Sequence, residues 1–337
     1  MKKVAVVGAG IAGLQASAIL SELGYEVILF EKDHKIGGNL LEKKYLFPHF
    51  TNTDEVLNEI KIKVENKVKI INSTEIKAIE IENNAFQVSS DSEIYKVDTV
   101  LLSTGYTLFN AKKKEELGYG IYTNVITSNE LERELYNERS LGLLENNSKS
   151  RVVFVHCVGS RDEKSGNHYC SKICCITAVK LAIQVRKQYP QTEIFCFYID
   201  LRMYGAGYEE LYREAQEKWK IQFIRGRVSE IAENRDTTIQ VKAEDTLSGR
   251  PIKMNSNLVV LMTGMVPSAS TKHFAEKFGA TNGTFFLHSK NRYLHANQSK
   301  HKGLFFSGSC TQPMNVAETL SDARSTACSI HLYLKSL

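Results

Sequence analysis

The sequence predicts an α/β fold made of two doubly wound, Rossmann-like domains in series, with β-meander insertions. Three observations carry this prediction. Short apolar runs rich in β-branched residues alternate with longer segments of helical periodicity, the pattern of parallel strands joined by helices. A glycine-rich turn follows the first apolar run, at residues 8–13. The length of 337 residues exceeds what one ordinary core fills and suits two domains.

Composition and charge exclude several classes of protein. Hydrophobic residues make up 42% and charged residues 24% of the chain, as in folded globular proteins. The net charge of +5 is small and its basic residues lie among acidic ones, so we expect a solvated surface and no nucleic-acid partner. No apolar run is long enough for a membrane span and no signal peptide is recognisable, so we expect a cytoplasmic protein that is not an integral membrane protein. Its seven cysteines should be reduced, buried or metal-bound.

The first 150 residues are expected to form most of one domain and a connection. The glycine turn should join a strand to a helix that ends near Gly24, and Asn83-Asn84 is typical of a hairpin turn. Residues 106–150 are polar and irregular, apart from a helix near 128–137. The expected strands here are 4–7, 25–30, 76–82, 85–88 and 97–102, and the expected helices are 11–23 and 54–67.

The rest of the chain repeats this alternation. The expected strands are 152–157, 194–199, 221–225, 228–233, 237–243, 258–262 and 304–306, and the expected helices are 171–188, 208–218 and 316–334. The first domain should then comprise residues 1–110 and 263–337, and the second should comprise 150–262. Residues 111–149 should connect the two.

The first glycine turn predicts a dinucleotide site. Gly8 permits a tight turn, Gly10 lets a pyrophosphate approach the backbone, and Gly13 lets the helix pack on the strand. Glu31 ends the second strand, where a carboxylate accepts hydrogen bonds from ribose hydroxyls, which favours FAD or NAD over NADP. The alternative is a glycine turn without a ligand, which the strand before it, the helix after it and the spacing of the acid all disfavour.

Three further segments favour FAD over NAD. A second glycine pair, Gly37-Gly38, follows the acid, a strand ends in Thr104-Gly105, and an apolar strand ends in Gly308 before the last helix. In this order they resemble the thioredoxin-reductase-like flavoproteins over the whole chain. Those proteins usually have Asp after the closing glycine, and Ser309 stands there in this sequence. The resemblance implies that FAD is bound by Gly8, Ala9, Gly10, Ile11, Ala12, Gly13, Glu31, Lys32, Gly38, Asn39, Thr104, Gly105, Gly308, Ser309 and Val316.

A cysteine group marks the second domain, where a second glycine motif would stand in a protein that also binds NAD. Only Gly159 follows the strand there, so NAD binding of the usual kind is doubtful. Four cysteines occur within nineteen residues instead, and they could hold a [4Fe–4S] cluster or zinc or form a redox disulfide, for example Cys170 with Cys174. They could also be buried free thiols, which we expect of Cys196 and Cys328, while Cys310 stays open. The four are Cys157, Cys170, Cys174 and Cys175.

Four stretches of this domain resemble the flavin-binding, A-type subunits of heterodisulfide reductases and their shorter relatives. They are Cys157-Val-Gly-Ser-Arg-Asp-Glu163, Tyr169-Cys-Ser-Lys-Ile-Cys-Cys175, Tyr208-Glu-Glu210 and Phe223-Ile-Arg-Gly-Arg227. The resemblance implies that Cys157, Cys170, Cys174 and Cys175 ligate a [4Fe–4S] cluster beside the FAD. It also implies that Lys180 lies near flavin N5, where a cation stabilises reduced flavin. The alternative for Lys180 is an exposed helical lysine.

The sequence departs from the longer members of that family. Residues 50–55 lack the extra cysteines of the long form, and no ferredoxin-type cysteine run is present. We therefore expect one cluster and one flavin, without electron bifurcation. Ala206 replaces a usual basic residue, and Gln312-Pro-Met-Asn315 replaces Gly-Pro-Lys-Asp, so charge is lost at both places.

Three functions remain in competition. The resemblance implies an electron-transfer flavoprotein that works with B- and C-type subunits in sulfur or thiol metabolism, and a homodimer is possible. The second function is an NADH-dependent FAD disulfide reductase of the thioredoxin-reductase type, which the single glycine of the second domain disfavours. The third is a scaffold that has lost its flavin.

Overall fold

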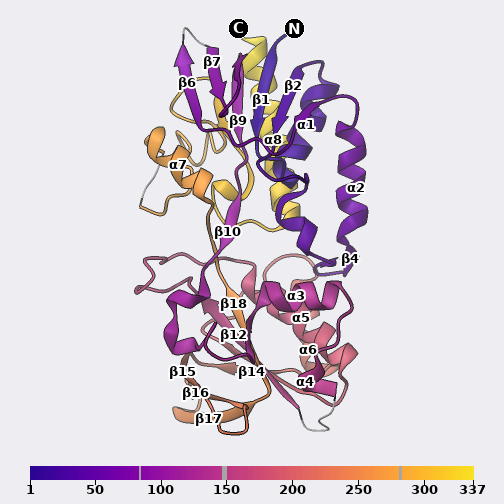
Figure 1. Ribbon diagram of the computed structural model, residues 1–337, viewed down its shortest axis with the longest axis vertical. Coiled ribbons are helices and arrows are strands. Elements are labelled where there is room, and N and C mark those ends of the chain that lie inside the picture. The colour runs from indigo at the N-terminus through magenta and orange to yellow at the C-terminus, as the bar shows by residue number, and fades with distance from the viewer. Residues whose placement is uncertain (83–84, 146–149, 281–282) are drawn as a thin grey trace. The chain divides into compact units, whose positions relative to one another are not determined.

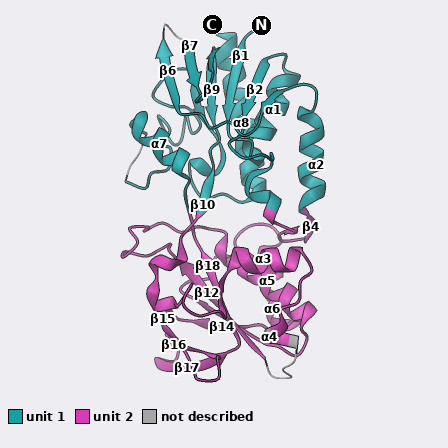
Figure 2. Cartoon of the chain, viewed as in Figure 1, with its two compact units in different colours: residues 1–41, 53–107, 266–337 teal, residues 42–52, 108–265 magenta. Residues whose placement is uncertain are grey.

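The computed structural model describes residues 1–82, 85–145, 150–280 and 283–337 as two compact units. Unit 1 comprises residues 1–41, 53–107 and 266–337, and unit 2 comprises 42–52 and 108–265 (Figure 2). Each unit contains one five-stranded sheet with helices packed against it. The predicted α/β fold with two units is therefore present, and most of unit 2 lies between segments of unit 1 in the sequence.

The sheet of unit 1 is parallel and has the strand order β20-β9-β1-β2-β5 (Figure 1). The chain starts in the centre of this sheet, because β1 pairs with β2 on one side and with β9 on the other. Central parallel strands are buried on both faces, and the apolar run Val4–Val7 is accordingly buried throughout. The strands are β1 (Lys3–Val7), β2 (Glu26–Phe30), β5 (Lys69–Ile71), β9 (Thr99–Leu102) and β20 (Leu304–Phe306).

Strand alternation divides the core of unit 1 into two layers. Val4 and Val6 pack into the cluster formed with α1 (Ile11–Glu22), α2 (Thr53–Val64) and α8 (Val316–Lys335). Ala5 and Val7 face the opposite cluster, which contains residues of a small antiparallel sheet and of α7 (Ala269–Lys277). The small sheet consists of β6 (Ala78–Glu82), β7 (Ala85–Ser89) and β8 (Ile94–Val97).

The sheet of unit 2 is also parallel and has the order β11-β18-β12-β13-β14. One of its faces packs with α3 (Ser128–Tyr136), α5 (Cys174–Gln188) and α6 (Tyr208–Glu217) in a single apolar cluster. The strands are β11 (Val125–Thr127), β12 (Arg151–Val158), β13 (Glu193–Tyr198), β14 (Gln222–Arg225) and β18 (Leu258–Thr263). An antiparallel meander completes the unit, formed by β15 (Val228–Glu233), β16 (Ile239–Asp245) and β17 (Arg250–Ser256).

Several elements differ from the sequence expectation. Residues 111–149 do not merely connect two domains, because β11 pairs with β18 inside the sheet of unit 2 and α3 packs on that sheet. Neither β17 nor α7 was expected from the sequence, since both are mostly polar. The expected turn at Asn83-Asn84 lies outside the described residues. The remaining short elements are β3 (Tyr45–Leu46), β4 (Thr51–Asn52), β10 (Tyr106–Leu108), β19 (Met265–Pro267), α4 (Gly142–Glu145) and the 3-10 turns Gly38–Glu42, Ala111–Lys113, Glu115–Leu117 and Gly308–Cys310.

Residues 42–52 belong to unit 2 although the chain on either side of them belongs to unit 1. They form a two-stranded antiparallel hairpin in which β3 pairs with β4. Phe47 packs edge-on against Tyr208 of α6, and Phe50 lies beneath the ammonium group of Lys187 on α5. Aromatic packing therefore fixes this short excursion of the chain to unit 2.

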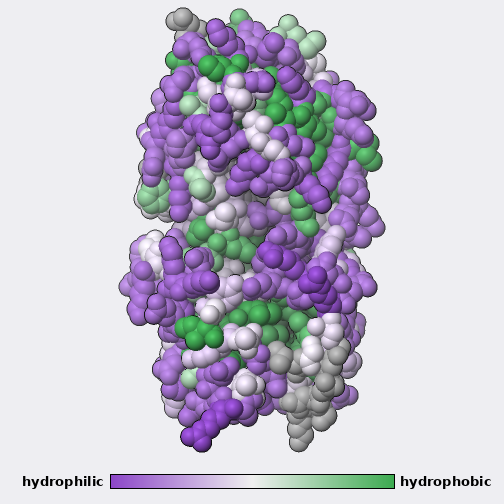
Figure 3. All heavy atoms as spheres, in the orientation of Figure 1, coloured by the Kyte–Doolittle hydropathy of each residue, from purple (hydrophilic) through white to green (hydrophobic). Residues whose placement is uncertain are grey.

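The surface visible in Figure 3 is mostly hydrophilic, with hydrophobic residues in scattered groups. Large apolar side chains that are individually exposed, such as Ile62 and Leu332, are ordinary for a folded protein. Among the described residues, no helix is both long and apolar enough to cross a bilayer.

The close contact between β1 and α1 gives a stability prediction. A Cβ atom on Gly13 would lie 2.0 Å from the carbonyl oxygen of Gly8, so Gly13→Ala should lower the free energy of unfolding by about 1–3 kcal/mol or more. Gly10→Ala is the matched control, because a Cβ there meets no protein atom within 4 Å and its φ of −70° suits alanine. Urea unfolding of both variants measures the difference. Equal stability of the two variants would contradict the packing argument.

Candidate functional site

The glycine turn after β1 has the geometry that a phosphate requires. Gly8 has a φ of +104°, and a Cβ on it would lie 2.5 Å from the Ser103 carbonyl oxygen, so only glycine fits there. Gly10 precedes α1 as its N-cap and supplies no side chain to the amides of the first turn. These amides and the helix dipole together favour an anion at this end of α1.

The other predicted FAD segments converge on this turn. Gly37 donates its backbone N–H to the Ala9 carbonyl at 2.8 Å, and a Cβ on Gly38 would lie 3.1 Å from the Cα of Gly10. A Cβ on Gly308 would lie 2.7 Å from the Cβ of Ala12, at the start of α1. A Cβ on Gly8 would also lie close to backbone atoms of residues 103 and 104, so the predicted Thr104-Gly105 segment lies at the same turn. Four segments that are far apart in the sequence therefore meet at the carboxyl end of β1.

Glu31 is buried beside the turn, with 6% of its surface exposed. Its Oε2 accepts a hydrogen bond from the Ala9 backbone N–H at 2.8 Å, and its Oε1 accepts one from Asp33 N–H at 3.1 Å. Each carboxylate oxygen can accept a second hydrogen bond, so both keep capacity for a hydroxyl. Binding of ribose by Glu31 stays a prediction.

The outer predicted FAD residues have different surroundings. Lys32 follows Glu31 and is exposed, whereas Ser309 is buried in the 3-10 turn after β20. Asn39 donates from Nδ2 to the Tyr106 carbonyl at 3.2 Å, one residue beyond the Thr104-Gly105 segment. Val316 is the first residue of α8. Their roles toward FAD stay predictions.

Two residues that were not expected from the sequence hold this region together. The Ser103 hydroxyl donates to the Gly8 carbonyl at 2.8 Å, and Asp322 on α8 accepts hydrogen bonds from Gly308 N–H at 2.7 Å and from the Ser307 hydroxyl at 2.8 Å. Burial raises the pKa of Asp322, although the Gly308 and Ser307 hydrogen bonds oppose the shift. The only signal available was an acidic residue within the last helix, fourteen residues after the closing glycine.

Unit 2 does not repeat the glycine turn of unit 1. In unit 1 only residues 8–10 separate β1 from α1, whereas in unit 2 residues 159–173 separate β12 from α5. Gly159 forms a tight turn with a φ of +73°, and a Cβ on it would overlap the ring of Phe109. Helix α5 therefore does not start where a pyrophosphate at the end of β12 would meet it, which argues against NAD binding of the usual kind.

Three of the four cysteines lie at the two ends of this longer connection, where β12 ends and α5 begins. Cys157 is near the end of β12, and Cys174 and Cys175 open α5. The pairing of β12 with β18 shifts in register between Val155 and Val158, and Cys157 has a φ of +59°, which is rare for a residue with a side chain. The backbone irregularity places Cys157 in the same buried cluster as Cys174 and Cys175.

Three of the four predicted ligands have thiols in contact. Cys174 is hydrogen-bonded to both Cys157 and Cys175, which raises the pKa of the Cys174 thiol. The same bonds and the neighbouring His156 lower the pKa of Cys157 and of Cys175, although burial opposes this. Cys170 is only half-buried, and its sulfur accepts a hydrogen bond from Lys172 N–H at 3.3 Å.

The donor set suits a [4Fe–4S] cluster by chemistry, because four thiols of the kind that such a cluster binds occur around one loop. Within the described ranges, no three His, Cys, Asp or Glu residues converge in the arrangement that holds a single metal ion. A cubane binds each thiolate at a different iron, so the contacting thiols of Cys157, Cys174 and Cys175 would have to separate to hold it. The four cysteines are therefore suitable ligands for the cluster, but their thiols are not arranged to hold it in this structure.

The sequence analysis also raised a disulfide and the burial of the other three cysteines, Cys196, Cys310 and Cys328. All seven cysteines are free thiols, so the Cys170–Cys174 disulfide is not formed in this structure. Cys196 is buried, as expected, and so is Cys310, where burial raises the thiol pKa to about 12. The expectation for Cys328 was wrong, because it lies on the outer side of α8 and is exposed.

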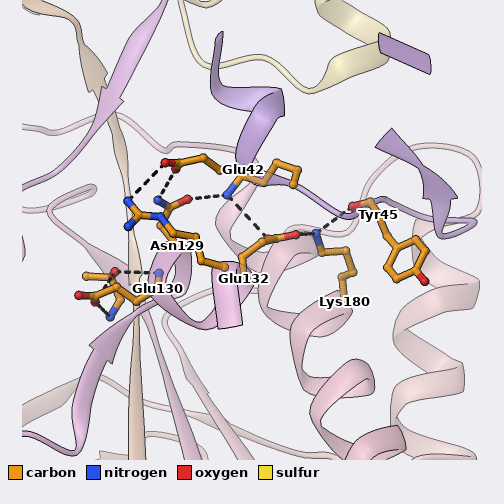
Figure 4. A network of polar contacts seen from close by, with 9 residues as sticks. Glu42, Tyr45, Asn129, Glu130, Glu132 and Lys180 are labelled. Atoms are coloured by element: carbon orange, nitrogen blue, oxygen red, sulfur yellow. Dashed lines mark hydrogen bonds and ion pairs between the residues drawn. The ribbon is translucent and has the colours of Figure 1, made fainter. Parts of the chain in front are cut away.

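Lys180 lies on α5 in a buried polar network (Figure 4). It is only 2% exposed, so the alternative of an exposed helical lysine is wrong. Its ammonium group donates to Glu132 Oε1 at 2.5 Å and to the Tyr45 carbonyl at 2.9 Å. The proposed place of Lys180 near flavin N5 stays a prediction.

Glu132 of α3 is the centre of this network and was also not expected from the sequence. Its second oxygen lies 3.8 Å from the Lys43 ammonium, which donates to Asn129 at 2.8 Å. Asn129 in turn donates to Glu42 at 2.6 Å (Figure 4). Burial lowers the pKa of Lys43, although Glu132 opposes the shift. The network thus attaches the 42–52 hairpin to α3 and α5.

The Lys180–Glu132 pair gives a second prediction. Lys180→Met leaves the Glu132 carboxylate buried without its closest cation, so the free energy of unfolding should fall by about 3–5 kcal/mol. The double variant Lys180→Met/Glu132→Leu should lose less than either single variant, because neither member of the closest pair is then left buried without the other. Lys218→Met, which removes an exposed pair with Glu214, is the control and should change stability little. Urea unfolding distinguishes these outcomes, and additive losses in the double variant would contradict the pairing.

Comparisons with known proteins agree with this arrangement. Residues 2–155 match the family described as pyridine nucleotide-disulphide oxidoreductase, which supports the predicted FAD site. The A-type iron-sulfur subunit of CoB–CoM heterodisulfide reductase from Methanocaldococcus jannaschii is 30% identical and matches 98% of this chain. A protein of the same description from Methanopyrus kandleri is 29% identical over 96% of the chain. The chain spans 64% and 63% of the lengths of these two relatives.

Solved structures establish the fold. Thioredoxin reductase of Lactococcus lactis has a TM-score of 0.70 at 16% identity, covering 100% of both chains. Thioredoxin reductase of T. acidophilum has a TM-score of 0.69 at 20% identity, covering 100% of this chain and 99% of the other. The chain is therefore an oxidoreductase with a thioredoxin-reductase-like fold, related over nearly its whole length to the A-type subunits of the heterodisulfide reductases.

Proposed function

We propose that this protein is an electron-transfer subunit that binds FAD in unit 1 and a [4Fe–4S] cluster at the four cysteines of unit 2. One observation supports the proposal: four distant segments converge on the glycine turn of unit 1, while the equivalent place in unit 2 is occupied by a cysteine-bearing loop. A second nucleotide that would deliver hydride to the flavin therefore lacks its usual binding turn.

In this proposal, residues of unit 1 bind FAD and the cysteines of unit 2 bind the cluster. The α1 amides and the Gly8–Gly13 backbone bind the pyrophosphate, Glu31 binds the ribose, and the Thr104-Gly105 and Gly308 segments enclose the rest of FAD. Cys157, Cys170, Cys174 and Cys175 hold the cluster. When bound, FAD couples two-electron and one-electron chemistry, and an iron–sulfur cluster accepts and donates single electrons.

The proposed partners follow from the relatives. Proteins similar to this chain are named as subunits of heterodisulfide reductases, so we propose B- and C-type subunits as partners and a sulfur or thiol compound as the final substrate. Because the chain spans less than two thirds of the length of these relatives, the further parts of those proteins have no counterpart in the residues described here.

Anaerobic purification should give about four iron and four sulfide per chain together with one FAD, as expected for one cubane and one flavin. Cys174→Ala should lose the iron and the EPR signal of the reduced cluster while retaining FAD, because the flavin site lies in the other unit. Cys196→Ala, which replaces a buried cysteine outside the proposed ligands, is the matched control and should keep its iron. One zinc and no sulfide in the wild-type protein would overturn the cluster assignment.

The rival function, an NADH-dependent disulfide reductase, makes the opposite prediction for isolated protein. We expect that dithionite bleaches the flavin absorbance and that NADH does not, because the connection after β12 does not form a second phosphate turn. Rapid bleaching at micromolar NADH, followed by stopped-flow absorbance, would favour the disulfide reductase. Loss of FAD from protein that is otherwise folded would favour the scaffold.

A further inference from the structure

We propose that Cys170 is the outer ligand of the cluster, at which one iron can be removed, and that the ion pair between Lys114 and Asp162 keeps this corner closed. This inference rests on the proposed function, since it concerns the cluster proposed there. It gives the four cysteines unequal roles, and it makes positioning residues of two charged side chains that are not ligands themselves.

The four cysteines have unequal surroundings. Cys157, Cys174 and Cys175 are buried and belong to one apolar cluster that β12 and α5 form together. Cys170 is only half-buried and lies in the connection between these two elements. The three buried cysteines are therefore held by a strand end and a helix start, whereas the place of Cys170 depends on how the connection folds.

The connection folds back on itself as a short hairpin. The Asp162 N–H donates to the Asn167 carbonyl at 3.0 Å, and the Asn167 N–H donates to the Asp162 carbonyl at 3.2 Å. Nearer to β12, the Arg161 N–H donates to the Tyr169 carbonyl at 2.9 Å. This pairing returns the chain toward the end of β12, and Cys170 follows directly after the last paired residue. The hairpin thus decides whether Cys170 comes back to the strand that carries Cys157.

A buried ion pair fixes this hairpin to the rest of unit 2. The Lys114 ammonium lies 2.7 Å from Asp162 Oδ2, and the two side chains are 10% and 4% exposed. The Ser165 hydroxyl donates to the same carboxylate oxygen at 2.6 Å, so Asp162 also holds the tip of the hairpin. Arg227 lies farther from the carboxylate, at 3.8 Å, and its side chain is 55% exposed, so it compensates the charge less.

The pair makes the folded hairpin sensitive to a single substitution. Both charges have left water for this contact, so removing one of them leaves the other buried without its closest partner. The hairpin can relieve that cost by opening, because water then reaches the remaining charge. An open hairpin no longer holds Cys170 at the start of the connection, while the three buried cysteines keep their places.

The chemical consequence concerns one corner of the cluster. Each cysteine thiolate of a cubane binds a different iron, so the loss of one ligand exposes one iron. A one-electron oxidant such as ferricyanide then converts [4Fe–4S]²⁺ into [3Fe–4S]⁺, with release of one Fe²⁺ and formation of one ferrocyanide. The three irons that remain are those that the buried cysteines Cys157, Cys174 and Cys175 would bind.

The rate of iron loss tests the ion pair. Complete, anaerobically purified and iron-loaded protein is mixed with one equivalent of ferricyanide, and the [3Fe–4S]⁺ signal is followed by freeze-quench EPR. In Asp162→Asn the Lys114 ammonium loses its closest anion, so the signal should form about tenfold faster than in the wild type. Asp245→Asn is the matched control and should react at the wild-type rate, because Asp245 also accepts from a serine three residues on, at 2.8 Å, but lies at the end of β16. Equal rates in Asp162→Asn and the wild type would overturn the role of the pair.

The iron content of two further variants separates the outer ligand from the buried ones. Cys170→Ala should retain about three irons per chain and show the [3Fe–4S]⁺ signal, because the buried cysteines still bind their irons. Cys174→Ala removes a ligand from the buried group and should lose the whole cluster. Complete loss of iron in both variants would contradict the unequal roles of the cysteines.

A last measurement needs no variant. Iron-loaded wild-type protein is alkylated anaerobically with iodoacetamide before and after ferricyanide treatment, and the modified peptides are identified by mass spectrometry. Cys170 should be modified only after oxidation, while Cys157, Cys174 and Cys175 stay protected. The exposed Cys328 should react in both samples and serves as the internal control. Modification of a buried cysteine ahead of Cys170 would overturn the proposal, whereas wild-type protein without iron would overturn the proposed function instead.

Discussion

The close approach of α1 to β1 is the constraint on which the functional architecture depends. No side chain fits at Gly8 or Gly13, because the helix start, the strand end and the 103–104 segment occupy the same few ångströms. This contact directs the first amides of α1 outward from the end of a central strand, and the segments at 37–38 and 308 then pack on that turn. The site is thus a consequence of how tightly one helix can be set against one strand.

In unit 2, the helix that follows the central strand is not held close to the end of that strand. The unit keeps a central parallel strand, a following helix and a core between them, but residues 159–173 now separate strand and helix. The connection can carry cysteines because it no longer has to shape a phosphate turn. Two buried hydroxyls, those of Ser160 at the start of this connection and of Thr263 at the end of β18, have no hydrogen-bond partner within the described residues. They lie where β12 and β18 end, the usual position for a ligand in such a sheet.

Local pattern was enough to predict most of the fold and the glycine turn after β1. Continuous apolar runs such as Val4–Val7 and Leu258–Met262 become buried parallel strands, and glycines mark the turns between them. What the sequence could not reveal depends on contacts between distant residues. The pairing of Glu132 with Lys180 joins α3 to α5, Asp322 reaches Gly308 from another helix, and β11 joins its sheet through only three residues. His156 was visible as one polar residue in an apolar strand, but its neighbours across β13 and α5 were not.

The order in which the segments occur along the chain has a consequence for biosynthesis. Unit 1 begins with β1 and is complete only when β20 and α8 have been added, whereas unit 2 ends at residue 265. On the ribosome, unit 2 can therefore acquire its full sequence first, while the sheet of unit 1 waits with an open edge at β9. The glycine turn is synthesised before most of unit 2, yet Gly308 can reach it only after unit 2 has been synthesised. Completion of the glycine-turn site should then be a late event, because it depends on strand β20 and helix α8.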